Sequence, residues 1–315
     1  MNKRPSCTFS VNVAIPDIPF LGFTIPHLIK SCNYPFNQRM IIVDNKPLAK
    51  RYRKAPSIGT LEQLLEVCHN LKKCGVVDEV KEVDYSSALR NRILVKHFGR
   101  SMWETHNHRG APIYSYVYAY EISDDDYFLH FDSDMMLHQT KGENWVADGI
   151  QLIEENEDVL TVTPLPGPPA ENGELIQRGV DYRRDRRGFY AFKEFTSRRF
   201  LVNRKKFDAF LPLDPVHLNV SFQRKLFSLI RQVSAMHRWE HMVTMKLKST
   251  SFIRADIDNP EVWTLHPLSC GDEFIEKLPG IISRIENGDY PEEQRGDYEL
   301  NFRAWTNRPA SRTTC

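Results

Sequence analysis

The chain has 315 residues, of which 41% are hydrophobic and 26% charged, so it can bury the core of one large domain or two closely packed ones. Its net charge of +1 creates no overall field that would attract nucleic acid or an acidic membrane. No apolar run approaches the length of about eighteen residues that a membrane span needs, and Met1 to Ser10 lacks the apolar core of a signal peptide. We therefore expect a soluble, cytoplasmic protein.

The cysteines are scattered along the chain and form no CxxC pair. In a chain of this size, such a distribution favours reduced, mostly structural thiols over a disulfide framework or a zinc site. The six cysteines are Cys7, Cys32, Cys68, Cys74, Cys270 and Cys315.

The first part of the chain alternates between predicted strands and helices. Thr8 to Ile15 alternates apolar and polar residues and stops before Pro16, which predicts a first strand. A helix is expected over Ile25 to Cys32. Arg39 to Asp44 then predicts a second strand that ends in a carboxylate.

The same alternation continues after a polar connection. Apolar residues in Thr60 to Cys74 recur at helical spacing, and Gly75 is placed to end that helix. Val76 to Val83 predicts a third strand, and Ser87 to Phe98 a helix closed by Gly99. This order is typical of parallel βαβ units.

A short apolar strand, Tyr127 to Phe131, ends abruptly in acidic residues. If the extended geometry continued, Asp132 and Asp134 would lie on the same side of the backbone. Carboxylates at the carboxyl end of a strand indicate a divalent cation, because Mg2+ and Mn2+ prefer oxygen ligands and often bind together with phosphates. The alternative is a solvated acidic turn, which is our interpretation of Asp124 to Asp126 before the strand.

The middle of the chain predicts further strands around one helix. Asn144 to Glu155 is amphipathic, and Val159 to Thr163 predicts a strand. Pro164 to Pro169 holds four prolines and a glycine, so we expect an irregular loop. Phe189 to Phe195 and Ser197 to Val202 predict two more strands.

Five arginines fall within Gln177 to Arg187. Their guanidinium groups would suit an anionic acceptor or product phosphates. A solvated loop, in which Asp181 and Asp185 partly balance the charge, is the interpretation that we favour.

The last third predicts two helical regions and a tail. Leu218 to Leu247 is expected to be mostly helical. Asp272 is placed to cap a final helix that runs to about Asn287, with a bend at Pro279. Tyr290 to Cys315 is polar, and its last residues are expected to form a frayed tail that either remains free or covers a site.

Two further patterns carry less information. His106 and His108 sit in a loop bounded by glycine and proline with no third metal ligand in view, so we place them at the surface. The tyrosines at positions 114, 116, 118 and 120 would share one face of a strand but would spread around a helix. Packing is their expected use.

Three motifs occur together in one order. They are a strand that ends in Ile-Ile-Val-Asp44, a helix with Ala88, Arg90 and Asn91, and a strand that ends in Asp132-Ser-Asp134. This order resembles the nucleotide-sugar-binding half of GT-A glycosyltransferases, most of all the inverting group related to family 2. The resemblance covers about Phe9 to Leu137.

The resemblance implies an α/β fold of GT-A type, a Rossmann-like, mostly parallel sheet flanked by helices in a single large domain. Residues 1–138 would form the nucleotide-sugar-binding half. Residues 139–290 would form the acceptor-binding and catalytic half, and residues 291–315 a C-terminal tail.

The resemblance also implies roles for the motif residues. Asp44 would accept a hydrogen bond from the nucleobase, and the forked donors of Arg90 would offset the charge of the diphosphate. Asp132 would approach the ribose or the metal, and Asp134 would be the main ligand of Mn2+ or Mg2+. The alternatives are a turn residue for Asp44 and a surface helix charge for Arg90.

An inverting transfer needs a carboxylate that takes the proton of the acceptor hydroxyl. The family places this base in a Glu-Asp pair that opens a helix, and here that pair is not intact. Glu240 is our choice for the base, His241 is the alternative, and Trp239 would form a wall on which the sugar stacks. The alternative for Glu240 is an exposed helical acid. Because the Glu-Asp pair is not intact, the identity of the base and the stereochemical outcome are open.

Downstream, Val262-Trp-Thr-Leu-His266 resembles the segment in which many members supply a late histidine ligand to the metal. Imidazole beside carboxylates suits Mn2+ better than Mg2+. The alternative for His266 is a structural histidine.

The resemblance thus implies a metal-dependent transfer of a sugar from a nucleotide diphosphate, UDP-sugar by default, to a hydroxyl acceptor, with inversion favoured over retention only by analogy with the family. The metal would act as a Lewis acid on the departing diphosphate. One alternative is a metal-dependent nucleotidyltransferase, although Ile15 to Gly22 lacks the basic, glycine-rich loop of such enzymes. The other is a relative that binds a sugar nucleotide or glycan without turnover.

Overall fold

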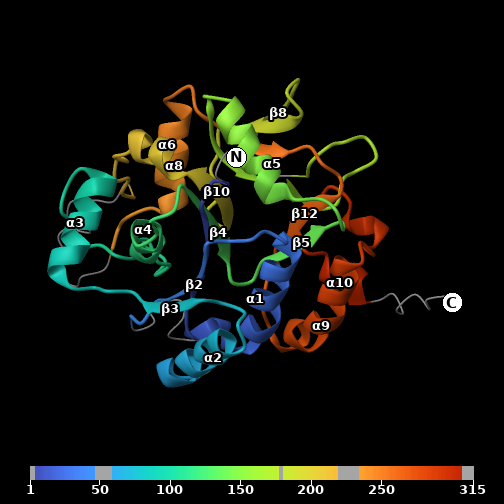
Figure 1. Ribbon diagram of the computed structural model, residues 1–315, viewed down its shortest axis with the longest axis horizontal. Helices are drawn as coiled ribbons and strands as arrows, with labels where there is room; N and C mark the ends of the chain where they lie inside the picture. Colours follow the sequence, from blue (N-terminus) through green and yellow to red (C-terminus); the bar gives the residue numbers. More distant parts are fainter. Residues whose placement is uncertain (1–3, 47–58, 177–179, 219–233, 307–315) are drawn as a thin grey trace.

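A large twisted sheet runs through the middle of the domain (Figure 1). The computed structural model describes residues 4–46, 59–176, 180–218 and 234–306. The nine strands of the sheet are β1 (Cys7–Val13), β2 (Gln38–Val43), β3 (Glu79–Glu82), β4 (Tyr127–Asp132), β6 (Val159–Thr163), β8 (Tyr182–Asp185), β9 (Phe189–Phe192), β10 (Arg199–Asn203) and β11 (Ile253–Ile257). Their order is β3-β2-β1-β4-β10-β6-β11-β9-β8.

The amino-terminal half of this sheet is parallel. Strand β1 pairs with β2 on one side and with β4 on the other, and β2 pairs with β3, all in parallel. The helices in this part of the chain are α1 (Ile18–Cys32), α2 (Leu61–Lys73), α3 (Ser87–Phe98) and α4 (Tyr114–Glu121). The predicted βαβ organisation is confirmed, and the carboxyl ends of β1, β2 and β4 meet at one edge.

The other half is mixed. Strand β10 runs antiparallel to both β4 and β6, whereas β11 is parallel to β6 and antiparallel to β9. The helices of this half are α5 (Trp145–Glu155), α6 (Arg204–Phe210), α8 (Trp239–Lys248), α9 (Asp272–Glu286) and α10 (Phe302–Thr306). The predicted fold class, a mostly parallel sheet flanked by helices in one domain, is confirmed.

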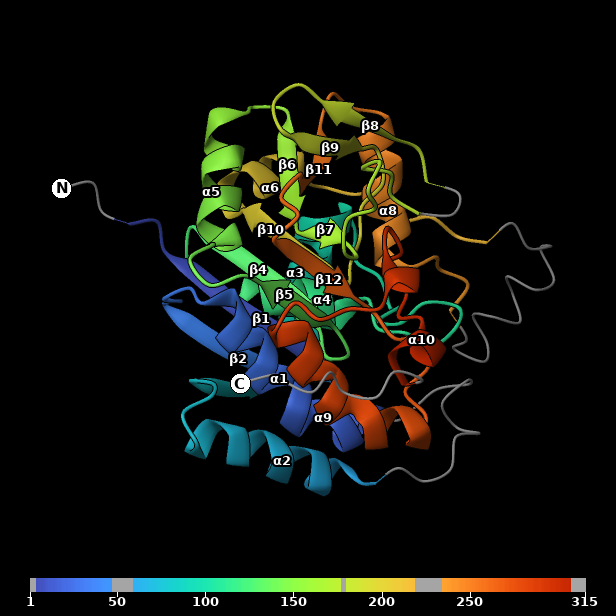
Figure 2. The same ribbon diagram turned by 90° about the vertical axis from the view of Figure 1, so that its right-hand side faces the viewer.

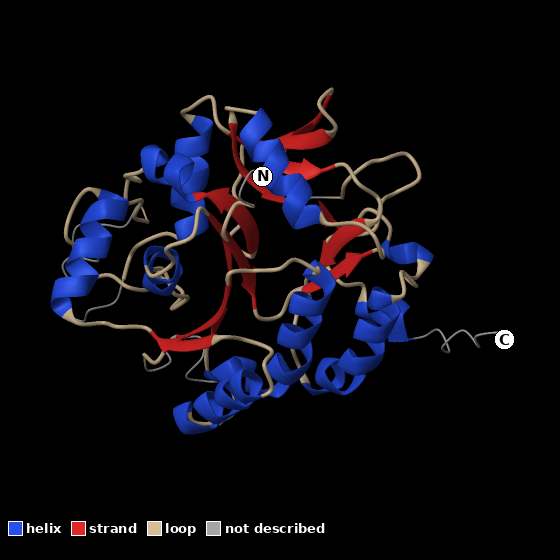
Figure 3. Ribbon diagram, in the orientation of Figure 1, coloured by secondary structure: helices blue, strands red, loops and turns tan. Residues whose placement is uncertain are grey.

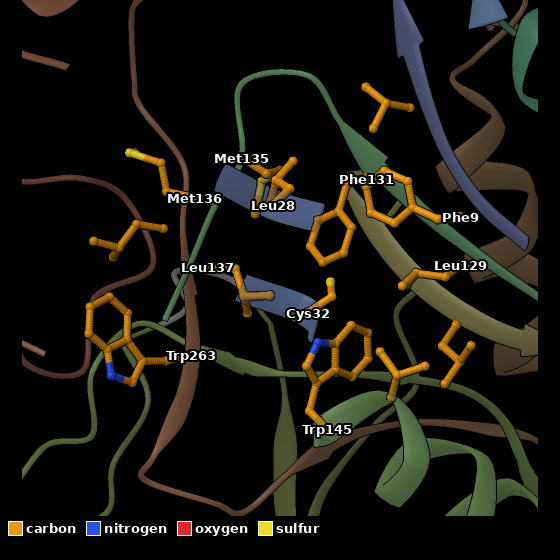
Figure 4. Packing of buried hydrophobic residues seen from close by; sticks show 14 of the residues in the cluster. Phe9, Leu28, Cys32, Leu129, Phe131, Met135, Met136, Leu137, Trp145 and Trp263 are labelled. Carbon is orange, nitrogen blue, oxygen red and sulfur yellow. The ribbon is translucent and has the colours of Figure 1, made fainter. Parts of the chain in front are cut away.

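Helices cover both faces of the sheet (Figure 3), because the strand residues alternate between two apolar layers. On β1, Phe9 and Val11 face a layer that α1, α2, α5 and α9 cover. On β4, Phe128 faces the opposite layer, which α3, α4, α6 and α8 cover. Figure 4 shows the first layer, where Leu28 of α1 and Trp145 of α5 lie close to Phe131.

A second, three-stranded sheet extends the first layer. It consists of β5 (Met136–Gln139), β12 (Val262–Leu265) and β7 (Leu165–Pro166), with β12 in the middle. In the antiparallel β5–β12 pair, Leu265 lies opposite Met136. The stretch expected to be an irregular loop, Pro164 to Pro169, therefore contributes a two-residue strand.

Two predicted helices differ from the structure. The first helix begins at Ile18, seven residues earlier than predicted, because Pro19 lies in the first turn, where its missing N–H is not needed. Of the long helix predicted over Leu218 to Leu247, residues 219–233 lie outside the described part. Residues 234–238 are not helical, and α8 begins at Trp239.

The arginine-rich segment forms a hairpin strand and not a loop. Residues 177–179 lie outside the described residues, and Tyr182–Asp185 is strand β8, paired with β9. Arg187 forms ion pairs with Asp158 at 2.7 Å and with Asp185 at 2.9 Å. The balance of charge that we expected is therefore present, but on an ordered strand and turn.

The carboxyl-terminal segment packs onto the domain as far as it is described. The sequence suggested a polar tail, yet Leu300 and Trp305 are each only 3% exposed. Trp305 Nε1 donates to Gln294 Oε1, which also accepts from the backbone of Asn301. Of the tail predicted over 291–315, residues 291–306 are thus part of the folded domain. In α9, Asp272 is the first helical residue and Gly271 occupies the cap position.

The described cysteines, Cys7, Cys32, Cys68, Cys74 and Cys270, carry free thiols. Within the described ranges, no helix combines the length and the apolar character that crossing a membrane requires.

Candidate active site

The acidic pair lies where β4 ends, at the edge that also receives the ends of β1 and β2. Strand β4 stops at Asp132, and the backbone turns back at once, since Met135 N donates to Asp132 O at 3.2 Å. Asp132 and Asp134 are therefore related by a tight turn and not by the pleat of a continuing strand. Asp132 N donates to Arg198 O at 2.7 Å, which ties this turn to the start of β10.

His266 comes from a distant part of the sequence and contacts Asp134. The β5–β12 register places the residue after Leu265 beside the turn that precedes Met136. His266 Nε2 lies 3.4 Å from Asp134 Oδ2. The other atoms, His266 Nδ1 and Asp134 Oδ1, are buried without a hydrogen-bond partner. The structure thus brings together two of the three predicted metal-binding residues.

The side chain of Asp132 is held by two donors. Tyr116 Oη donates to Asp132 Oδ1 at 2.7 Å, and His130 Nε2 lies 3.2 Å from the same oxygen. Burial raises the pKa of Tyr116, and the charge of Asp132 raises it further, so Tyr116 is a hydrogen-bond donor at neutral pH. Sequence analysis missed Tyr116 because its four-tyrosine pattern did not reveal which ring faces the acids.

A third carboxylate, Asp17, belongs to the same neighbourhood. It ends the short 3-10 helix η1 (Ile15–Asp17) that follows β1, and its Oδ2 accepts from Ala14 N at 2.8 Å. Burial raises its pKa to about 7, and the charges of Asp134 and Asp132 also raise it. The signal that could have identified it is an acid just after the first strand, at the same sheet edge.

One cation faces the acids. Burial opposes the charge of Arg198, but Tyr298, Asp132 and Asp134 raise its pKa above the ordinary value. Its guanidinium carbon lies 5.6 Å from the centre of the Tyr298 ring, and that ring stacks on His266 at 5.8 Å. The sequence offered no way to choose Arg198 over the neighbouring arginines.

Glu240, the predicted base, lies in the first turn of α8 on the side of the acids. Its charge raises the pKa of Tyr116, after the larger effects of burial and of Asp132. Glu240 Oε1 accepts from Ser197 N at 3.4 Å, and Arg238 Nη1 lies 3.3 Å from Oε2. His241, the alternative base, instead stacks on His237 at 4.5 Å.

Trp239 does not form the predicted sugar-stacking wall. It is only 2% exposed and belongs to the second apolar layer. Its ring stacks on Tyr116 at 5.5 Å and also contacts Phe195 and Phe200. Trp239 therefore supports Tyr116 from behind.

Asp44 lies at the end of β2 in a polar pocket of its own. Its oxygens accept from Tyr85 Oη at 2.8 Å and lie 3.2 Å from His106 Nε2. Lys46 Nζ donates to Thr105 at 3.0 Å and lies 4.3 Å from the centre of the Tyr85 ring. The His106 side chain is partly covered, with 19% of its surface exposed, because its loop folds over the end of β2.

Arg90 is not in contact with the acidic pair in the described part of the chain. It lines a separate hollow of about 430 Å³ on α3, together with Asn91, Arg100, Trp103 and His217. Its charge also lowers the pKa of Lys46, after the larger effect of burial, so Arg90 is near Lys46. Its Nε is buried without a partner.

Within the described ranges, no three His, Cys, Asp or Glu side chains are gathered as a ready-made metal site. No protein-family model matches the chain, and no curated protein matches it.

The fold is similar to several solved structures at low sequence identity. A structure of GalNAc-T7 with UDP, GalNAc and Mn2+ has a TM-score of 0.49 at 12% identity and covers 84% of this chain. The mannosyltransferase PcManGT from Pyrobaculum calidifontis, with GDP-Man and Mn2+, has a TM-score of 0.37 at 9% identity and covers 67% of this chain. TarS of S. aureus has a TM-score of 0.45 at 12% identity and covers 91% of this chain. The chain spans 44%, 48% and 41% of these proteins, respectively. Similarities at this level do not establish an activity.

Proposed function

We propose that this protein is a metal-dependent glycosyltransferase that moves a sugar from a nucleotide diphosphate, by default a UDP-sugar, to a hydroxyl acceptor. The observation that carries the proposal is the contact between Asp134 and His266 beside Asp132, at the edge where β1, β2 and β4 end. An α/β sheet binds ligands at this edge. In the proposal, residues 1–138 bind the donor and residues 139–290 supply the acceptor site and the base.

The residues at this edge fit a divalent cation. Asp134 has a buried oxygen without a partner, and His266 and Asp132 add a nitrogen and further oxygens. Such a set suits Mn2+, or Mg2+ with diphosphate oxygens and water completing the shell. When bound, the ion would neutralise charge on the diphosphate leaving group.

The chain's own residues would position the donor. Asp44, with His106 and Tyr85 around it, would bind the nucleobase edge, because its oxygens retain acceptor capacity beyond the hydrogen bonds that they already accept. Arg198 would contact the diphosphate, since it already faces the acids. Arg90 would stabilise the donor charge from the hollow on α3.

Glu240 would accept the proton of the attacking hydroxyl. A carboxylate held by Ser197 N and Arg238 is fixed in position, as a general base must be. Attack from the face opposite the diphosphate would invert the anomeric centre.

Calorimetric titration tests donor binding. The metal-stripped protein is titrated with UDP, GDP and dTDP, with and without Mn2+, as wild type and as Asp134→Asn. Asp124→Asn, on an exposed acid before β4, is the control. We expect one nucleotide to bind only with Mn2+, and binding to be lost in Asp134→Asn alone. The absence of nucleotide binding under all conditions would exclude the proposal.

Product analysis then tests turnover. A transferase releases a nucleoside diphosphate and slowly hydrolyses its donor when no acceptor is present. A non-catalytic binding protein releases nothing, and a nucleotidyltransferase releases pyrophosphate from a nucleoside triphosphate.

A further inference from the structure

A cavity of about 800 Å³ is lined in part by Tyr298. Its walls come from the starts of β10 and α9, from β11 and from the carboxyl-terminal segment through α10. Helices α9 and α10 lie beside each other in Figures 1 and 2. The lining residues used below are Arg199, Arg254, Gly271, Asp297, Tyr298 and Asn301.

Arg199 brings an unpaired charge into this cavity. It is only 2% exposed, and its Nε is buried with no hydrogen-bond partner. Among the described residues, no carboxylate forms an ion pair with its guanidinium, since the nearby Asp256 pairs with Arg254, and the Tyr298 ring lies 4.5 Å away. Because arginine cannot lose its proton in a protein, a buried guanidinium without a partner is costly unless an anion completes it.

The neighbouring Arg254 does not share this property. Its Nε lies 2.7 Å from Asp256 Oδ1, its Nη2 lies 3.2 Å from Oδ2, and its Nη1 donates to Glu194 O. The two arginines and Asp256 together carry a net charge of +1. That excess belongs to Arg199.

The start of α9 also favours an anion in this cavity. Gly271 occupies the cap position, so no side chain caps the helix, and residues 271–274 line the cavity. The first-turn N–H groups have no intrahelical acceptor, and the helix dipole adds a partial positive charge there. The buried Arg199 and this helix start thus bring two kinds of anion-binding donor to the lining of one cavity.

The exposed residues that line the cavity carry a net negative charge. Asp272, Glu273 and Glu299 are exposed there and outnumber the exposed Arg303, and Asp297 accepts from Glu299 N at 2.9 Å. This excess of acids at the rim would repel a polyanion. A ligand with one anionic end and a neutral, hydroxyl-bearing remainder fits both the rim and the floor.

We propose that this cavity binds the acceptor and recognises it through a single phosphate or carboxylate group held by Arg199 and the start of α9. The proposal rests on the transferase function proposed above. Tyr298 is both a wall of the cavity and the ring stacked on His266, so an anchored acceptor lies one aromatic ring away from the metal-binding residues.

Anion binding is tested first, without metal or nucleotide. The full chain is titrated with inorganic phosphate and with acetate, as wild type, Arg199→Met, Arg199→Lys and Asn301→Asp. Asp is a good helix cap at the start of α10 and adds a negative charge to the cavity lining. We expect at least about tenfold weaker binding in Arg199→Met and Asn301→Asp, and partial recovery in Arg199→Lys.

Equal binding of both probes by wild type and Arg199→Met, or no binding by wild type, would overturn the proposal. If Arg199→Met does not fold, the Asn301→Asp and Arg199→Lys variants decide the matter. The affinity for nucleotide with Mn2+ is measured on the same variants and should be unchanged. If the wild type binds no nucleotide, the transferase proposal fails, but the result for anion binding still stands.

Acceptor assays test the assignment to the acceptor. Glucose, glucose 6-phosphate and glucuronate are compared as probes with the donor nucleotide identified by titration. We expect Arg199→Met to raise the KM of the charged probe that the protein uses at least about tenfold while kcat changes little. A neutral acceptor used as well as the charged ones, and unaffected by Arg199→Met, would refute the assignment. The two charged probes distinguish a phosphate from a carboxylate.

Discussion

His266 Nε2 lies 3.4 Å from Asp134 Oδ2, although the two residues belong to opposite halves of the chain. The antiparallel pairing of β5 and β12 creates this contact, because Leu265 lies opposite Met136. The proposed metal site therefore depends on the register of a small sheet as well as on the two side chains.

Replacing His266 with Gln removes the only nitrogen donor proposed for the metal. We expect Mn2+-dependent nucleotide affinity to fall at least about tenfold, or ~1.4 kcal/mol, with little change in metal-free binding. Calorimetric titration measures this, and His69→Gln on the exposed face of α2 is the control. Unchanged Mn2+ dependence in His266→Gln would make this histidine structural.

Tyr116→Phe removes one hydrogen bond to Asp132 and leaves the ring that stacks on Trp239. Since outer-shell partners orient ligating carboxylates, the metal affinity should fall by about 10- to 100-fold. The matched control is Tyr118→Phe on the same helix, whose hydroxyl donates to Glu82 O at 3.3 Å, away from the acids. Equal effects of the two variants would show that the loss is not specific to Asp132.

Glu240→Gln and His241→Gln separate the two candidate bases. If Glu240 accepts the acceptor proton, Glu240→Gln should lower kcat by about 10²- to 10⁴-fold while nucleotide binding is retained. His241→Gln should retain most activity, because His241 stacks on His237. A larger loss of kcat in His241→Gln than in Glu240→Gln would reverse the assignment.

Trp239→Ala should destabilise the protein by about 3 to 5 kcal/mol, since it empties a large buried volume behind Tyr116. Chemical denaturation measures the free energy of unfolding, and Trp239→Phe should lose less. If Trp239 stacked on the sugar, Trp239→Ala would instead raise the acceptor KM and leave the stability of the protein unchanged. That result would contradict the buried position of Trp239.

The contacts of Glu286 on α9 with His27 and Lys30 on α1 predict a dependence of stability on pH. The Nδ1 atom of His27 lies 3.0 Å from Glu286 Oε1, and Lys30 contacts the other oxygen. The hydrogen bond from His27 and the weaker effect of Lys30 lower the pKa of Glu286 from 4.5 to about 2, although burial acts in the opposite direction. The ionised form thus favours the folded state, fully above about pH 4.5 and progressively less as pH falls toward about 2.

Glu286→Gln should therefore reduce the free energy of unfolding at pH 7 by on the order of 2 kcal/mol, with allowance for partial exposure. The difference from wild type should shrink as the pH falls below about 4.5. Denaturation curves between pH 7 and pH 3 measure it, and Glu276→Gln on the exposed face of α9 is the control. A difference that is constant with pH would mean that charge plays no part.

Local patterns in the sequence predicted much of the first half of the fold. Alternating apolar residues predicted β1, a short apolar run that ends in a carboxylate predicted β2, and helical segments followed by glycine predicted α2 and the bounds of α3, Ser87–Phe98. These features depend on neighbours in sequence, whose side chains share a face of one strand or helix. The acid pair after β4 could be placed at the sheet edge for the same reason.

The sequence was less informative where a residue's role depends on distant parts of the chain. Trp239 looked like an exposed aromatic beside Glu240, yet long-range packing on Phe195 and Phe200 buries it. His106 looked like a loop residue until its loop closed over Asp44. No local pattern distinguished Arg198, which faces the acids, from Arg199, which faces the cavity.

The sequence by itself determined the parallel half of the sheet and the acids at its edge, because both follow from residue type and local periodicity, whereas the proposed role of His266 came from a resemblance to a known family. Only the tertiary structure decided that Asp17, Tyr116 and Arg198 join them and that Arg199 is buried without a partner. The physical reason is that burial and pairing of charges depend on segments brought together by the folded sheet, which local periodicity does not specify.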